Sequence, residues 1–241
     1  MRVRNEVNNI FDEMMIPRIT STVEKNRLKI GYTEIGQEVD LGLKQASHTL
    51  ISGISRSGKT QMALHLLDSL TKYSMVVVYS MKPGDFFMYR DKVRLVEDKY
   101  EMFSLLRMTV GEIEKRANRI REQSEKAGHV VECTDRPMIV MIDEYASLSK
   151  DMDDATENAI EKIAAVGAGL NVYLYIITQV PKKSVMLGTL RDNMMTDIAF
   201  KQRSPETSRM AIGSNAAMML PLGQCIVRNV DRNFKVTHMT E

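Results

Sequence analysis

The sequence has few cysteines, no tryptophan and no long hydrophobic segment. Its two cysteines, Cys133 and Cys225, are far apart and show neither zinc-site spacing nor a disulfide framework, which agrees with a reducing cytosol. No apolar run approaches the roughly 18–20 residues that a membrane-spanning helix needs. The first residues also lack the hydrophobic region of a signal peptide. We therefore expect a cytoplasmic protein with no membrane segment in this chain.

An excess of one charge is also missing. The 241 residues include 33 basic and 31 acidic side chains, a net charge of +2. Nucleic-acid binding through bulk charge is therefore unsupported, and any such contact needs a local basic patch. The length suits one large α/β domain, or a core domain with a small appendage.

The most informative stretch is Gly53–Thr60, which fits the pattern G-x-x-x-x-G-K-[ST] of phosphate-binding loops. Two glycines let the backbone wrap so that successive N–H groups point at an anion. Lys59 is placed to reach the β- and γ-phosphates, and the Thr60 hydroxyl to bind Mg²⁺. The nucleotide contacts predicted from this pattern come from Gly53, Ile54, Ser55, Arg56, Ser57, Gly58, Lys59, Thr60 and Gln61.

The flanks support this interpretation over a glycine-rich surface turn. Residues 48–52 read as a short buried strand, and apolar residues recur at helical spacing from Ala63 to Leu70. A strand, a glycine loop and a helix place a helix N-terminus against a phosphate.

A second stretch ends in two acids. Residues 137–142 form a continuous apolar run, typical of a strand buried on both faces, and Asp143 and Glu144 follow it. Asp143 is placed to organise Mg²⁺, and Glu144 to polarise the water that attacks the γ-phosphate. The alternative is that the two acids only cap the following helix.

Further buried runs at 75–80, 171–178 and 196–200 alternate with helical patterns, which predicts a mainly parallel sheet with helices on both faces. Gln179 ends one of these strands, at the edge where open α/β sheets bind ligands. It either senses the γ-phosphate or is a satisfied strand-end amide. A hairpin at 29–41 precedes the core, so we divide the chain into an N-terminal segment, 1–46, and an ATPase domain, 47–241.

Two groups of charges have open interpretations. The longest helix signal, at about 100–123, carries Arg116 among the charges of its polar side, which by themselves indicate a solvated face. Lys182 and Lys183 form a basic loop after the strand that ends at Gln179. They are either solvated side chains or contacts for DNA phosphates.

Five stretches, in matching order, resemble the FtsK/SpoIIIE branch of the HerA–FtsK motor ATPases. The resemblance covers roughly residues 29–230 and is carried by 48–60, 111–116, 139–144, 169–181 and 196–209. There are departures: Ser55 and Arg56 replace the usual Thr-Gly in the phosphate loop, and Val180 replaces the usual arginine. The stretch 82–86 resembles the corresponding segment of plasmid-transfer and type VII secretion relatives.

The resemblance implies a RecA-like ASCE fold, hydrolysis of ATP with Mg²⁺, and a homo-oligomeric ring, usually a hexamer, that moves double-stranded DNA. It also implies an arginine that reaches the active site of the neighbouring subunit, for which Arg116 is the first candidate and Arg209 the second. It strengthens the γ-phosphate role of Gln179. A membrane-bound partner is compatible with it. The alternatives are a type VII secretion-like ATPase that moves a polypeptide, and a nucleotide-binding assembly protein without catalysis.

Overall fold

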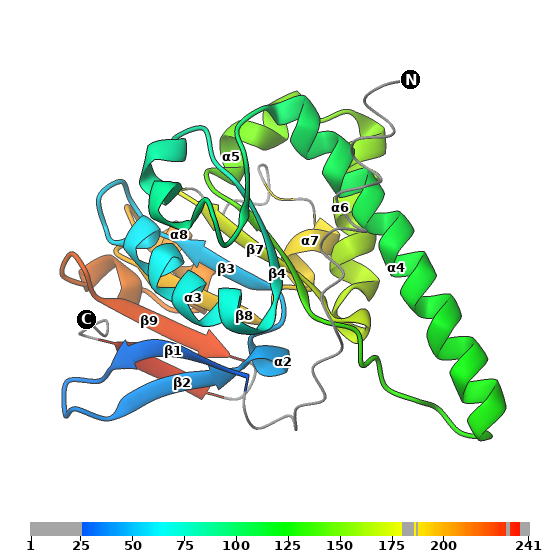
Figure 1. Cartoon of the computed structure of the whole chain (residues 1–241). Coiled ribbons are helices and arrows are strands. Elements are labelled where there is room, and N and C mark those ends of the chain that lie inside the picture. The colour runs from blue at the N-terminus through cyan, green and yellow to red at the C-terminus, as the bar shows by residue number, and fades with distance from the viewer. Residues whose placement is uncertain (1–25, 180–185, 187, 230–231, 237–241) are drawn as a thin grey trace.

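The computed structural model describes residues 26–179, 186, 188–229 and 232–236, the side chains of 232–235 excepted. A sheet of eight described strands forms the centre (Figure 1), in the order β10-β9-β8-β3-β7-β6-β4-β5. Its strands are β3 (Thr49–Ser52), β4 (Met75–Tyr79), β5 (Arg94–Val96), β6 (Met138–Ile142), β7 (Val172–Thr178), β8 (Thr196–Phe200), β9 (Cys225–Asn229) and β10 (Arg232–Val236).

The sheet is parallel from β8 to β5, and only β9 and β10 at one edge run antiparallel. Every residue of β3, β6, β7 and β8 is buried, as expected for strands covered on both faces. The predicted mainly parallel sheet is confirmed, and the antiparallel pair β9–β10 closes it at one edge. The three-residue edge strand β5 was not predicted, because so short a run carries no periodicity.

Helices cover both faces of the sheet. The longer ones are α3 (Lys59–Tyr73), α4 (Lys99–Ala127), α6 (Asp154–Val166) and α8 (Pro205–Ile212). The shorter ones are α2 (Leu43–Ala46), α5 (Tyr145–Leu148) and α7 (Gly188–Asp192), with 3-10 turns η2 (Pro83–Tyr89), η3 (Ser149–Asp151), η4 (Ala168–Leu170) and η5 (Ala216–Met219). Among the described residues, no helix combines the length and apolar character needed to cross a membrane.

Two hydrophobic clusters divide the core between the faces. Ile51 of β3 packs in a cluster with α3, and its neighbour Leu50 packs in a cluster with α4 and α6. Successive side chains of a strand point to opposite faces, so β3 is held from both sides. This double packing fixes the strand that leads into the phosphate loop.

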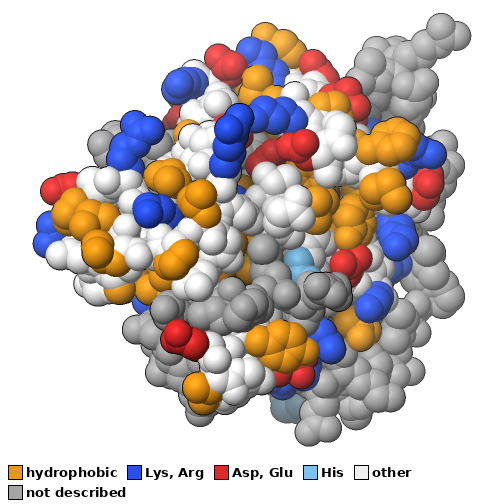
Figure 2. Space-filling model, turned by 90° about the vertical axis from the view of Figure 1, so that its left-hand side faces the viewer, with side chains coloured by type: hydrophobic (Ala, Val, Ile, Leu, Met, Phe, Trp, Pro, Cys, Tyr) orange, Lys and Arg blue, Asp and Glu red, His pale blue; other side chains and the backbone are white. Residues whose placement is uncertain are grey.

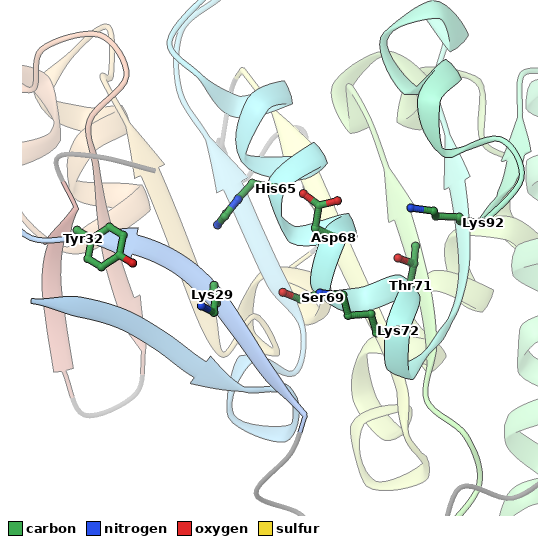
Figure 3. Close-up of a pocket in the computed structure, with 8 residues that line it drawn as sticks. All are labelled: Lys29, Tyr32, His65, Asp68, Ser69, Thr71, Lys72 and Lys92. Atoms are coloured by element: carbon green, nitrogen blue, oxygen red, sulfur yellow. The ribbon is translucent and has the colours of Figure 1, made fainter. Parts of the chain in front are cut away.

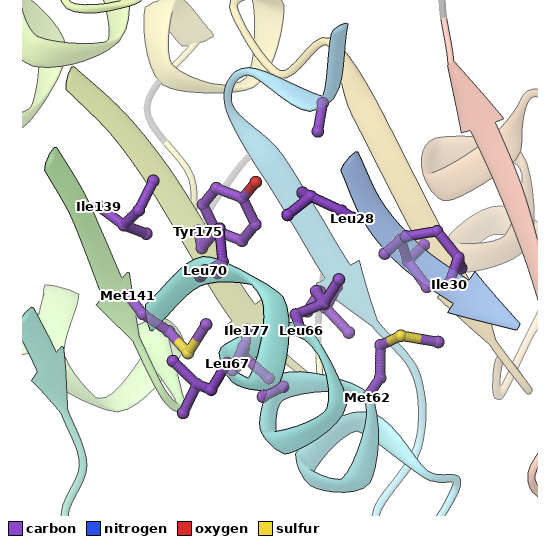
Figure 4. Close-up of a cluster of buried hydrophobic side chains, with 14 of the residues drawn as sticks. Leu28, Ile30, Met62, Leu66, Leu67, Leu70, Ile139, Met141, Tyr175 and Ile177 are labelled. Atoms are coloured by element: carbon purple, nitrogen blue, oxygen red, sulfur yellow. The ribbon is translucent and has the colours of Figure 1, made fainter. Parts of the chain in front are cut away.

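A small hairpin lies over α3. It consists of β1 (Arg27–Tyr32) and β2 (Glu38–Gly42), paired antiparallel as predicted. Leu28 and Ile30 enter the same hydrophobic cluster as Met62 and Leu66 of α3 (Figure 4). The described part of the N-terminal segment therefore shares its core with the larger domain, and the boundary at residue 46 stays a prediction. Phe11, Met14, Met15 and Ile16 predict a short amphipathic helix before Pro17, and this stretch lies outside the described residues.

Candidate nucleotide site

The loop between β3 and α3 has the backbone of a phosphate cradle. Gly53 and Gly58 have φ of +156° and +116°, which favour glycine. A Cβ at either position would also lie 2.7 or 2.8 Å from carbons of Phe200, at the end of the neighbouring strand β8. The two glycines of the motif are therefore required by the backbone and by the close approach of Phe200.

Two further features of this loop fit an anion. The first amides of α3 point out of its N-terminus without carbonyl partners inside the helix, which makes this end a site for negative charge. The buried Oγ of Ser57 has no hydrogen-bond partner among the described residues. The donors and the shape fit the phosphates of a nucleotide.

Lys59, the first residue of α3, is almost fully buried and donates to the carbonyl oxygen of Ile54 at 2.9 Å. Burial lowers the pKa of this lysine, while the charges of Glu144 and Asp143 raise it. The two acids after β6 therefore act electrostatically on the lysine of the phosphate loop. Segments more than 80 residues apart in sequence form one site.

Asp143 follows β6 and is held by the adjacent strand β4. Its backbone N–H donates to the Tyr79 carbonyl at 2.9 Å, and its Oδ2 accepts from the Ser80 hydroxyl at 3.0 Å. Burial raises the pKa of Asp143, and the Ser80 hydrogen bond opposes that rise. A buried, oriented carboxylate of this kind suits a cation-organising role.

Glu144 and Gln179 are directly bonded. The Nε2 of Gln179 donates to Oε2 of Glu144 at 2.9 Å. Since β7 lies between β3 and β6, Gln179 at its end is placed between the phosphate loop and the acids. Glu144 adopts φ of +54°, a conformation that a non-glycine residue rarely takes and that recurs at functional sites.

Ser80 belongs to this site and was missed from the sequence. It is fully buried, and its Oγ also accepts the backbone N–H of Lys82 at 3.0 Å. The available signal was its place as the last residue of the apolar run at 75–80, next to the other strand ends. Polar residues at the carboxyl ends of parallel strands meet at one edge.

Arg116 lies elsewhere, and its position contradicts the prediction that it reaches a neighbouring subunit. Its side chain is 2% exposed and its Nε bonds Glu112 at 2.9 Å. Its Nη1 donates to the carbonyls of Leu170 and Asn171, at the start of β7 and therefore opposite the end that carries Gln179. Arg116 ties α4 to the sheet of its own chain.

The other predicted contacts are in varied positions. Arg209 lies on the exposed side of α8, and the structure records no side-chain partner for it among the described residues. Ser55, Arg56 and Gln61 are exposed along the phosphate loop, and Thr60 is half-buried at its end. Lys182 and Lys183 lie outside the described residues.

A cavity of about 710 Å³ lies away from this edge, between α3 and the hairpin (Figure 3). Its lining consists of Lys29, Tyr32, His65, Asp68, Ser69, Thr71, Lys72 and Lys92. It contains none of the residues described above, so it is separate from the candidate nucleotide site at the strand ends.

Comparison with known proteins supports the resemblance. No family model matches the chain. The DNA translocase FtsK of Staphylococcus epidermidis is 26% identical over 221 residues, which cover 81% of this chain and 28% of that protein. FtsK of Lactococcus lactis subsp. cremoris is 25% identical, covering 88% of this chain and 32% of that protein. The chain thus spans less than a third of the length of these relatives.

Solved structures share the fold. The pCW3 conjugation coupling protein TcpA, solved as a monomer with ATPγS, superposes with a TM-score of 0.77 at 20% identity, over 93% of this chain and 70% of TcpA. EssC (ATPases 2 and 3) of Geobacillus thermodenitrificans gives 0.75 at 16% identity, over 93% of this chain and 47% of that chain. The predicted resemblance to FtsK-type translocases and the RecA-like α/β fold are confirmed.

Proposed function

From this resemblance to FtsK-type DNA translocases, we propose that the chain is an ATP-hydrolysing motor that moves double-stranded DNA. The observation that carries the proposal is the convergence of Lys59, Asp143, Glu144 and Gln179 at one sheet edge. Positioning and charge stabilisation are what phosphoryl transfer requires of a protein, and these side chains supply both.

The residues divide between holding the nucleotide and acting on water. The loop 53–60 and Lys59 bind the phosphates, and Thr60 and Asp143 hold Mg²⁺. Both would supply oxygen ligands, the kind that Mg²⁺ takes in proteins. Among the described residues, no cluster of three or more acids, histidines or cysteines could hold a metal ion. Bound ATP with Mg²⁺ supplies the phosphoryl group that is transferred to water.

Glu144 orients the attacking water and accepts its proton. The hydrogen bond from Gln179 holds the Glu144 carboxylate at the edge, so the amide is a positioning group for the acid. Its position between β3 and β6 also allows it to contact the γ-phosphate. The presence of both acids argues against a nucleotide-binding assembly protein without catalysis.

Assembly and DNA binding belong to the same proposal. Copies of the chain form a ring, most simply a hexamer, in which Arg209 of one copy reaches the nucleotide of the next. Lys182 and Lys183 remain the candidates for DNA phosphates. Contacts of that kind are indifferent to sequence and weaken with salt.

A motor that moves a polypeptide is the second candidate. It is favoured by the fold similarity to the type VII secretion ATPase EccC of Thermomonospora curvata, with a TM-score of 0.73 at 21% identity over 93% of this chain and 30% of that chain. Both candidates use the same nucleotide site, so only the cargo separates them.

ATPase rates with and without duplex DNA, with particle mass measured in a non-hydrolysable ATP analogue, test the proposal. We expect DNA to raise the rate severalfold at low salt and less at high salt, because phosphate contacts release counterions. Heparin of matched charge serves as the control polyanion. A rate independent of DNA, with no retention on DNA at low salt, would favour the polypeptide motor; no hydrolysis in any condition would refute both.

A further inference from the structure

A turn near the C-terminus is bonded to the phosphate loop. The backbone N–H of Gly223 donates to the Ser57 carbonyl at 3.0 Å. Gly223 has φ of +82°, and the N–H of Gln224 closes the turn on the Pro221 carbonyl. The phosphate loop and this orange segment after α8 lie side by side at the left of Figure 1.

The residues before and within the turn differ in burial. Ala217 and Leu220 are buried in a small cluster with Ala211 of α8. Met219 and Leu222 instead expose 76% and 61% of their surface. Single exposed apolar residues are common, but here two lie three positions apart, next to the turn that is bonded to the phosphate loop. Figure 2 shows the face at the left of Figure 1, with several hydrophobic side chains exposed on it.

We propose that Leu222, with Met219, forms the platform on which the flat ring of the nucleotide base lies. This inference rests on the proposed function, since it concerns the same bound nucleotide. The phosphate loop offers backbone amides, hydroxyls and the Lys59 amine, which suit the phosphates rather than the base. Ligand sites usually combine a few polar contacts with apolar walls, and the turn bonded to Ser57 supplies such a wall. The base is carried on the ribose, beyond the phosphates. When it covers these side chains, apolar surface on both is removed from water, which favours binding.

The platform predicts a particular pattern of recognition. Leu222 and Met219 contact the face of a ring and provide no side-chain donor or acceptor for its edge. ATP and GTP should therefore bind within a few fold of each other, because stacking on a ring face is tolerant of base identity. A triphosphate without a base should bind independently of Leu222.

The test compares Leu222→Ser with Val130→Ser, a matched loss of an exposed apolar side chain; Val130 is 89% exposed after the far end of α4. Affinities for ATPγS are measured by calorimetry, and for inorganic tripolyphosphate by competition with ATPγS. We expect Leu222→Ser to weaken ATPγS by about five- to tenfold and to leave tripolyphosphate unchanged. Val130→Ser should change neither.

Photolabelling with 8-azido-ATP gives an independent readout, since the label should attach to the peptide 216–224. Unchanged ATPγS affinity in Leu222→Ser, equal losses for both ligands, or labelling confined to other peptides would overturn the platform. A change in assembly alone would make Leu222 a contact between copies and would also overturn it. Lys59→Ala separates the two proposals: retention of both ligands in that variant would refute the phosphate site itself.

Discussion

Ser80 orients the carboxylate of Asp143 in the candidate nucleotide site. The N–H of Lys82 donates to the Ser80 hydroxyl, which donates in turn to Asp143 at 3.0 Å. The chain of bonds leaves Asp143 one preferred orientation at the end of β6. Because Ser80 bonds the charged form of the carboxylate, it also counteracts the rise in the Asp143 pKa that burial causes.

Ser80→Ala should therefore lower the apparent affinity of the site for Mg²⁺. Loss of a partner that orients a metal-organising carboxylate typically costs about tenfold in metal affinity, so we expect about that increase in the Mg²⁺ concentration for half-maximal ATPase. The pKa of Asp143 should rise when the bond is removed, which moves the acidic limb of the pH–rate profile to higher pH.

Ser80→Thr, which keeps the hydroxyl, is the matched control and should retain most of the Mg²⁺ response. Thermal unfolding of both variants separates this effect from a loss of stability. An unchanged Mg²⁺ dependence in Ser80→Ala would show that Asp143 needs no support from β4.

The sequence predicted Asp143, Glu144 and Gln179 because each directly follows a buried apolar run, and the carboxyl ends of parallel strands share one edge. The same rule applied to Ser80, which was counted as part of its strand. The bond between Gln179 and Glu144 was beyond the sequence, because it depends on β7 lying between β3 and β6. Strand order follows from packing among apolar runs that look alike in sequence.

Among the elements, α4 shows where periodicity was insufficient. The charge pattern predicts a solvated face that includes Arg116, but the buried positions in this part of the helix are Thr109, Ile113 and Arg116. Arg116 can lie on this buried face of α4 because the stem of its side chain is apolar and its guanidinium donates hydrogen bonds to Glu112 and to two backbone carbonyls. Composition marks such an arginine as a surface residue, so its burial could not be predicted.

Arg116→Met should destabilise the protein by about 2–4 kcal/mol, because it leaves two carbonyls without their charged donor and removes the nearer of the two arginines beside Glu112. ATPase per folded molecule should stay near the wild-type value, since the residue is remote from the phosphate loop. Urea unfolding followed by circular dichroism measures the free energy of unfolding. The ATPase rate per folded molecule is measured at a temperature at which both proteins are folded.

Arg121→Met, on the exposed end of the same helix, is the control and should change stability by less than about 0.5 kcal/mol. If Arg116→Met had the stability of the wild type but no ATPase activity, Arg116 would have a role in catalysis and not in stability.

At the scale of the whole molecule, the phosphate loop and the acids lie at the same edge of the sheet, because β3 and β6 flank β7 and run parallel to it. The terminal segment from Phe200 to Gly223 braces the phosphate loop: the Lys201 carbonyl accepts from Ile54, and Gly223 donates to Ser57. Arg209 projects from α8 within this same segment. In the proposed ring, a head-to-tail contact between copies brings one copy's α8 to the next copy's nucleotide; contacts of this kind form rings when their rotation closes.

Mixing two inactive variants tests this arrangement. Arg209→Ala keeps its own acids but donates no arginine, whereas Glu144→Gln donates the arginine but cannot activate water. A site is complete only where an Arg209→Ala subunit meets a Glu144→Gln neighbour, so random mixing at equal amounts should restore about a quarter of the sites. A mixture of Glu144→Gln with wild type is the control, because it shows whether one inactive subunit stops the whole ring. If subunits hydrolyse ATP independently, the ATPase rate of this mixture should fall in proportion to the fraction of Glu144→Gln. If that control behaves so and the first mixture stays inactive, Arg209 acts within its own subunit; if Arg209→Ala alone hydrolyses ATP normally, another group completes the site.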